Sequence, residues 1–161
     1  MNDHTERDSR FLEMAIELSR KGMQNSQGGP FGCVVVRDEK VVGEGYNQVT
    51  SSNDPTAHAE VVAIRAACQK LGTYQLTECE IYTSCEPCPM CLASAYWARI
   101  DAIYYGANAA DAAKAGFDDA FLYDEMRKQH AERTIPSTQM LREEAGESFK
   151  AWLESPNKIQ Y

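Results

Sequence analysis

The sequence of 161 residues lacks the features that would direct a chain to a membrane or keep it unfolded. No apolar run approaches the roughly 20 residues that span a bilayer, and the polar start at residues 1–8 lacks the apolar core of a secretory signal. Proline, glycine and serine never accumulate into a linker. Length and a hydrophobic fraction of 43% instead favour one folded domain over residues 1–161, located in the cytoplasm.

Positive charge is also scarce. The chain carries 16 Lys and Arg against 24 Asp and Glu, which gives a net charge of −8. This balance repels a phosphate backbone unless basic residues cluster on one face, and no such cluster is visible in the sequence. We therefore expect a small-molecule partner, with neither nucleic acid nor membrane bound.

Cysteine is present but is not distributed as in a disulfide framework. Three of the six cysteines, Cys85, Cys88 and Cys91, lie within seven consecutive positions. This spacing suits a metal in a reducing compartment, so we predict no structural disulfide. We expect Cys33, Cys68 and Cys79 to be small buried residues.

Hydrophobic periodicity predicts an α/β layered domain. Helices are expected over residues 8–25, 56–71 and 87–98, a hairpin over 31–36 and 41–46, and strands over 79–83 and 102–105. The alternation of strands and helices from residue 41 onward predicts that those strands lie adjacent and parallel. The C-terminal part is expected to contain a loop over 108–119, a helix over 120–129, a strand over 137–141, a helix over 143–153 and a tail over 155–161.

Two motifs carry the predicted chemistry. His58-Ala59-Glu60 supplies an imidazole and a carboxylate, and Pro87-Cys88-Pro89-Met90-Cys91 supplies two thiolates one helical turn apart. One zinc ion held by His58, Cys88 and Cys91 keeps a fourth position for water and lowers the pKa of that water. Glu60 is then a general acid/base that moves protons, and the combination predicts a hydrolytic deaminase of nucleobases.

Other interpretations of these residues stay open. Adding Cys85 to His58, Cys88 and Cys91 would give a closed structural zinc site, as in a non-catalytic interaction domain, but Glu60 would have no task. A redox Cys-x-x-Cys would leave His58 and Glu60 without a role.

The same motifs and further stretches resemble the cytidine and deoxycytidylate deaminase superfamily, and within it the bacterial guanine deaminases, over nearly the whole length. The matching stretches include residues 28–32, 50–60, 74–76, 82–91, 96–99, 115–119 and 132–136. The resemblance implies a three-layer α/β/α fold with a central mixed sheet of about five strands. It also implies hydrolysis of guanine to xanthine and ammonia, in purine catabolism or salvage.

The resemblance carries roles to particular residues. His58, Cys88 and Cys91 become the zinc ligands, Glu60 the proton shuttle and Asp119 a second catalytic carboxylate. Substrate-binding roles pass to Asn47, which holds a polar edge of the base, and to Phe31, Trp97, Ala59 and Tyr161. A homodimer is implied, with the C-terminal tail over residues 155–161 covering the active site and exchanged between subunits.

Four of these residues also have ordinary structural interpretations. Asn47 suits a turn, Asp119 suits a helix N-cap, and Phe31 and Trp97 suit a core. Alternatives to the substrate also remain, namely guanosine, cytosine, an aminotriazine or the adenosine of a tRNA.

Overall fold

The computed structural model describes residues 4–161, which fall into two compact units. The first unit extends to Ala120, and the second is Phe121–Tyr161. Each unit is described by itself. The expectation of one domain over residues 1–161, with a tail covering the active site, remains a prediction.

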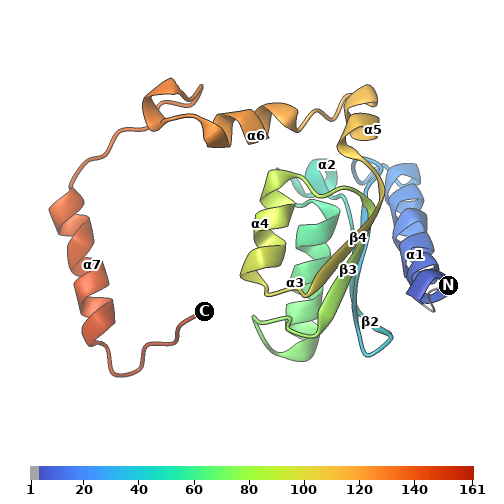
Figure 1. Cartoon of the computed structure of the whole chain (residues 1–161), viewed down its shortest axis with the longest axis horizontal. Helices are drawn as coiled ribbons and strands as arrows, with labels where there is room; N and C mark the ends of the chain where they lie inside the picture. The colour runs from blue at the N-terminus through green and yellow to red at the C-terminus, as the bar shows by residue number, and fades with distance from the viewer. Residues whose placement is uncertain (1–3) are drawn as a thin grey trace. The chain divides into compact units, whose positions relative to one another are not determined.

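The first unit is built on a mixed sheet of four strands in the order β2-β1-β3-β4 (Figure 1). The strands are β1 (Gly32–Arg37), β2 (Lys40–Tyr46), β3 (Cys79–Cys85) and β4 (Ala102–Ala107). The predicted hairpin is confirmed, because β1 and β2 pair antiparallel across a turn in which Asp38 and Glu39 both have positive φ.

Two details of the predicted sheet are wrong. The sheet has four strands and not five, because residues 137–141, a mostly polar segment after Pro136, form no strand. The strands β2 and β3 are not neighbours, because β1 lies between them and pairs antiparallel with both. Only β3 and β4 form the expected adjacent parallel pair.

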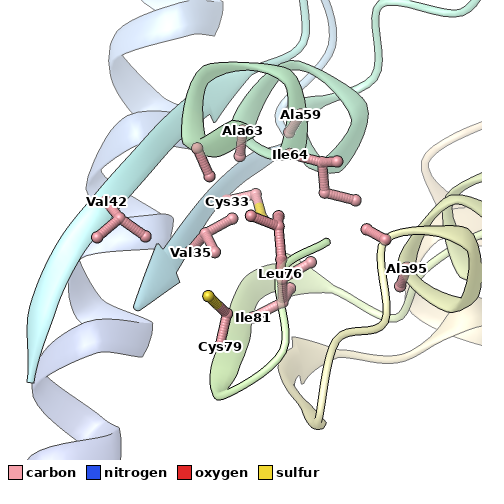
Figure 2. Close-up of a cluster of buried hydrophobic side chains, with 12 residues drawn as sticks. Cys33, Val35, Val42, Ala59, Ala63, Ile64, Leu76, Cys79, Ile81 and Ala95 are labelled. Carbon is pink, nitrogen blue, oxygen red and sulfur yellow. The ribbon is translucent and has the colours of Figure 1, made fainter. Parts of the chain in front are cut away.

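Helices cover both faces of this sheet, as predicted. One face packs against α1 (His4–Gln24), and the other against α3 (Ala59–Leu71) and α4 (Pro89–Trp97) (Figure 1). Successive strand residues point to opposite faces, so Val35 and Ile81 join the core beneath α3, while Val34 and Tyr82 join the core beneath α1. Figure 2 shows the first of these cores, with Cys33 and Cys79 among its buried side chains.

Both helices that carry the zinc motifs begin later than the sequence predicts. Helix α3 starts after His58 and α4 starts after Cys88, and each of these two residues occupies the N-cap position with an extended backbone. Two short helices, α2 (Val49–Ser52) and α5 (Ala109–Lys114), were not predicted, and α5 lies within the loop expected over residues 108–119. A capping box between Asn108 and Asp111 opens α5.

The second unit contains the 3₁₀ turn η1 (His130–Glu132) and α7 (Arg142–Glu154), and α6 (Ala120–Arg127) begins at the boundary between the units. The predicted helices are therefore present with shifted ends. No side chain of residues 121–161 is buried, and large apolar residues such as Phe149, Trp152 and Tyr161 are exposed. Within residues 4–161 no helix is both long and apolar enough to cross a bilayer.

Candidate metal centre and active site

The three predicted zinc ligands converge at the N-termini of α3 and α4. The Sγ atoms of Cys88 and Cys91 are 3.5 Å apart, and each lies 3.5 Å from Nδ1 of His58. Cys88 and Cys91 are buried and His58 is half-buried. The chain reverses direction between the strand ends and these helices, which brings residues 30 positions apart in sequence to one point.

These separations fit zinc. Zinc–sulfur bonds of about 2.3 Å and a zinc–nitrogen bond of about 2.0 Å at tetrahedral angles place two sulfurs about 3.8 Å apart, and sulfur and nitrogen about 3.6 Å apart. The observed 3.5 Å distances lie close to both values. One imidazole and two thiols also form a donor set that zinc prefers, with a coordination position left over. The residues therefore fit one zinc ion per chain.

The pKa shifts of the two cysteines and of His58 bear on how the site binds a cation. The hydrogen bond with Cys91 and the proximity of His58 lower the pKa of Cys88 to about 4. The same hydrogen bond with Cys88, together with burial, raises the pKa of Cys91. The hydrogen bond to Cys88 also raises the pKa of His58. Zinc would bind both sulfurs as thiolates and would therefore displace their protons.

Glu60 lies in the first turn of α3 with only 6% of its surface exposed. Burial raises the pKa of its carboxyl group above the ordinary value. The hydroxyl of Thr83 approaches Oε1 of Glu60 at 3.3 Å. A buried carboxyl group with a raised pKa, next to a metal site, is suited to taking up and returning a proton.

A pocket of about 270 Å³ opens beside these groups. Its size is near the lower end of the range for small-molecule sites. The lining combines the metal site, polar side chains and aromatic rings, and consists of Gly29, Phe31, Asn47, Val49, Thr50, Pro55, His58, Glu60, Cys85, Glu86, Cys88, Phe117 and Asp119. The pocket lining therefore contains Cys88 and five other residues for which the sequence predicted a catalytic, substrate-binding or metal-binding role.

Asn47 is buried at the end of β2, and the hydrogen bonds fix the orientation of its amide. Its Oδ1 accepts from the backbone N–H groups of Gly29 and Val49, both at 3.2 Å. A side chain on Gly28 would collide with this oxygen, because an added Cβ would lie 2.2 Å from it. With Oδ1 occupied, Asn47 offers its NH₂ group to the pocket as a donor.

The far wall of the pocket is formed by residues that follow α5. Phe117 packs edge-on against Phe31 with ring centroids 4.9 Å apart. Burial and the negative charge of the nearby Cys88 thiolate raise the pKa of Asp119. The neighbouring Asp118, and not Asp119, accepts the N–H of Ala120 at the start of α6. The carboxyl group of Asp119 is therefore available on the pocket side.

Other predicted residues do not join the lining. Trp97 ends α4 with 62% of its surface exposed, and Ala59 is fully buried at the start of α3. Tyr161 is exposed in the second unit. Their binding roles remain predictions. Cys85 lines the pocket but is not part of the metal-binding group, and its Sγ contacts the carbonyl oxygen of Asn108 at 3.8 Å.

Several residues of the site were not predicted from the sequence. Glu86 lines the pocket and its Oε2 accepts the N–H of Ala109, which ties the β3–α4 turn to α5. Phe117 and Thr83 were missed as well. Phe117 could have been found, because it is an aromatic residue two positions before the predicted Asp119. The sequence around Thr83 does not distinguish it from any other residue of a buried strand.

Comparisons with known proteins agree with this geometry. The family model for the cytidine and deoxycytidylate deaminase zinc-binding region matches residues 5–107. The guanine deaminase of Bacillus subtilis (strain 168) is 54% identical over 151 residues, which cover 94% of this chain and 97% of that protein. The X-ray structure of guanine deaminase from B. subtilis matches with a TM-score of 0.92 at 53% identity, covering 100% of this chain and 99% of that one. A tRNA-specific adenosine deaminase of Buchnera aphidicola is 35% identical over 111 residues, covering 69% of this chain and 73% of that protein.

Proposed function

The chain belongs to the cytidine and deoxycytidylate deaminase family, and we propose that it is a zinc-dependent hydrolase that converts guanine to xanthine and ammonia. The observation that carries this proposal is the 54% identity to a guanine deaminase over 94% of the chain, which includes every residue of the metal-binding group. The pocket beside that group has room for a small base.

The reaction exchanges an exocyclic amine for an oxygen. Water adds to the ring carbon that bears the amine, the carbon–nitrogen bond breaks, and ammonia leaves. His58, Cys88 and Cys91 would hold the zinc ion, which would supply a water of lowered pKa. Glu60 would take the first proton of the water and place it on the ring nitrogen. It would then carry the remaining proton of the added hydroxyl group to the departing amine, as the C=O bond forms and the C–N bond breaks.

The remaining lining residues orient the base in this proposal. Asn47 donates its NH₂ to an acceptor atom on the purine edge, since its oxygen is occupied by backbone. Asp119 accepts N–H groups of guanine, and the raised pKa of its carboxyl group also allows proton transfer. Phe31 and Phe117 form an apolar wall against the ring.

We further propose that the protein is a homodimer in the cytoplasm. Residues 121–161 bury none of their own side chains, so their apolar residues need a surface to cover them. We infer that this segment packs on a second copy of the chain and that residues 155–161 cover its active site. Six free cysteines support a reducing compartment.

Deamination of adenosine in tRNA is the second candidate, since such an enzyme is 35% identical to this chain over 111 residues. That match covers 69% of this chain, whereas the guanine deaminase match covers 94%. The net charge of −8 also disfavours a tRNA partner.

The test is a substrate panel. Zinc-loaded protein is offered guanine, guanosine, adenine, cytosine, cytidine and tRNA separately, and ammonia is measured. We expect release with guanine as the preferred substrate. Ammonia release from tRNA alone would contradict guanine deamination and would favour deamination of adenosine in tRNA.

A further inference from the structure

Thr83 places a buried hydroxyl next to the carboxylate that moves protons. Its side chain is 1% exposed, and its Oγ1 lies 3.3 Å from Oε1 of Glu60 and 3.4 Å from the carbonyl oxygen of Gly32. The residue sits near the end of β3, where alternation directs Tyr82 toward α1 and Thr83 toward α3. The hydroxyl therefore approaches Glu60 from the sheet, on the side away from the solvent.

The sheet fixes this hydroxyl in place. Thr83 is paired with Cys33 in the antiparallel β1–β3 ladder, and the next residue, Ser84, accepts the N–H of Gly32 at 3.0 Å. Gly32 has no room for a side chain, because an added Cβ would lie 2.2 Å from the carbonyl oxygen of Ala15. A β-branched residue in such a strand also has few χ1 rotamers. The backbone thus aims the hydroxyl at Glu60.

Two further groups lower the pKa of the Glu60 carboxyl group through hydrogen bonds, namely its own backbone N–H and the side chain of Cys91. A zinc-bound Cys91 is a thiolate with no proton to donate. Among the described residues, the hydroxyl of Thr83 then remains as a side-chain donor at 3.3 Å from Oε1 of Glu60.

We propose that Thr83 is a positioning residue for the reaction, which rests on the proposed function. Its hydroxyl holds Oε1 of Glu60 so that the carboxylate stays directed at the pocket.

The test compares variants that differ by the hydroxyl alone. Thr83→Val removes it from an isosteric side chain, and Thr83→Ala and Thr83→Ser form a second pair that both lack the methyl group. Loss of a hydrogen bond to a charged group lowers kcat for guanine by about ten- to hundred-fold in the Val and Ala variants. We expect an unchanged KM, one zinc per chain in all variants, and recovery of most of kcat in Thr83→Ser.

The possible results are distinguishable. Wild-type kcat in Thr83→Val, or equal losses in Thr83→Ala and Thr83→Ser, would overturn the inference while wild-type turnover of guanine keeps the proposed function. Loss of zinc from Thr83→Ala but not from Thr83→Ser would overturn it as well, since the hydroxyl would then support the metal site. Absence of turnover by the wild-type protein would overturn the proposed function and this inference with it.

Discussion

Glu60 combines burial with a position next to three potential metal ligands. Burial of an ionisable group costs free energy, and buried ionisable groups concentrate at sites of proton transfer. Its pKa is raised mainly because burial disfavours the charged form. A glutamine side chain at this position would fill the same space, but its amide group could not shuttle a proton.

Replacement of Glu60 by Gln should therefore separate chemistry from folding. We expect kcat for guanine to fall by about 10²- to 10⁴-fold, with zinc content and thermal unfolding midpoint near those of the wild type. The control is Glu44→Gln, since Glu44 is an exposed residue of β2 on no part of the pocket. Wild-type turnover by Glu60→Gln would remove the proton shuttle from the mechanism.

The cysteines of the β3–α4 turn differ in role although all three are buried. Only Cys88 and Cys91 belong to the metal-binding group with His58. We expect Cys88→Ser to lose most of its zinc, because serine is a much poorer ligand, whereas Cys85→Ser keeps one zinc per chain. Metal analysis of the purified variants checks this. Zinc loss from Cys85→Ser would favour the closed structural site.

At this scale the sequence predicted what the motifs specify. A histidine, two cysteines and a carboxylate at fixed spacing require one geometry, and the structure brings them together. Residues without a motif were harder to find. Thr83 acquires its contact with Glu60 from strand pairing, and Glu86 acquires its contact with Ala109 from a turn, and neither is encoded locally.

The elements of the first unit were predictable where the periodicity was strong. Hairpin, sheet-covering helices and strand positions follow from apolar patterns. The order of strands was not predictable, because the insertion of β1 between β2 and β3 depends on long-range pairing. The short helices α2 and α5 were missed since four to six residues carry little periodic signal, although Asn108 and Asp111 offered a capping pattern.

Packing of α3 on β2 sets the position of the metal-binding turn. An added Cβ at Gly45 would lie 2.3 Å from the carbonyl oxygen of Ala59, directly after His58. We expect Gly45→Ala to lower the free energy of unfolding by about 1–3 kcal/mol and to reduce zinc content, because α3 must shift. Thermal unfolding and metal analysis measure both effects. In Gly146→Ala of α7 the new methyl group meets nothing within 4 Å, so neither quantity should fall. Equal behaviour of the two variants would contradict this account of the packing.

The first unit and residues 121–161 differ in how much apolar surface they bury. The first unit has two cores on opposite faces of its sheet, whereas residues 121–161 bury no side chain. A segment of this composition is stable only against another surface. This contrast is the physical basis for proposing that the segment packs on a second copy, and it could not be read from the sequence because its helices are individually ordinary.

Deletion of residues 156–161 should impair turnover of guanine more than zinc content. The physical reason is that an uncovered pocket holds the base less firmly and admits water around it. Steady-state kinetics and metal analysis check this, with Tyr161→Phe distinguishing the ring from its hydroxyl. Unchanged kinetics after the deletion would remove the role of the tail as a cover.

The most direct measurement of the central claim is the stoichiometry of products from guanine before and after zinc removal. The zinc-loaded protein should form xanthine and ammonia in equal amounts, lose this activity on chelation, and regain it when one zinc per chain is restored. Absence of xanthine with the metal bound, or full activity in the chelated protein, would contradict the account.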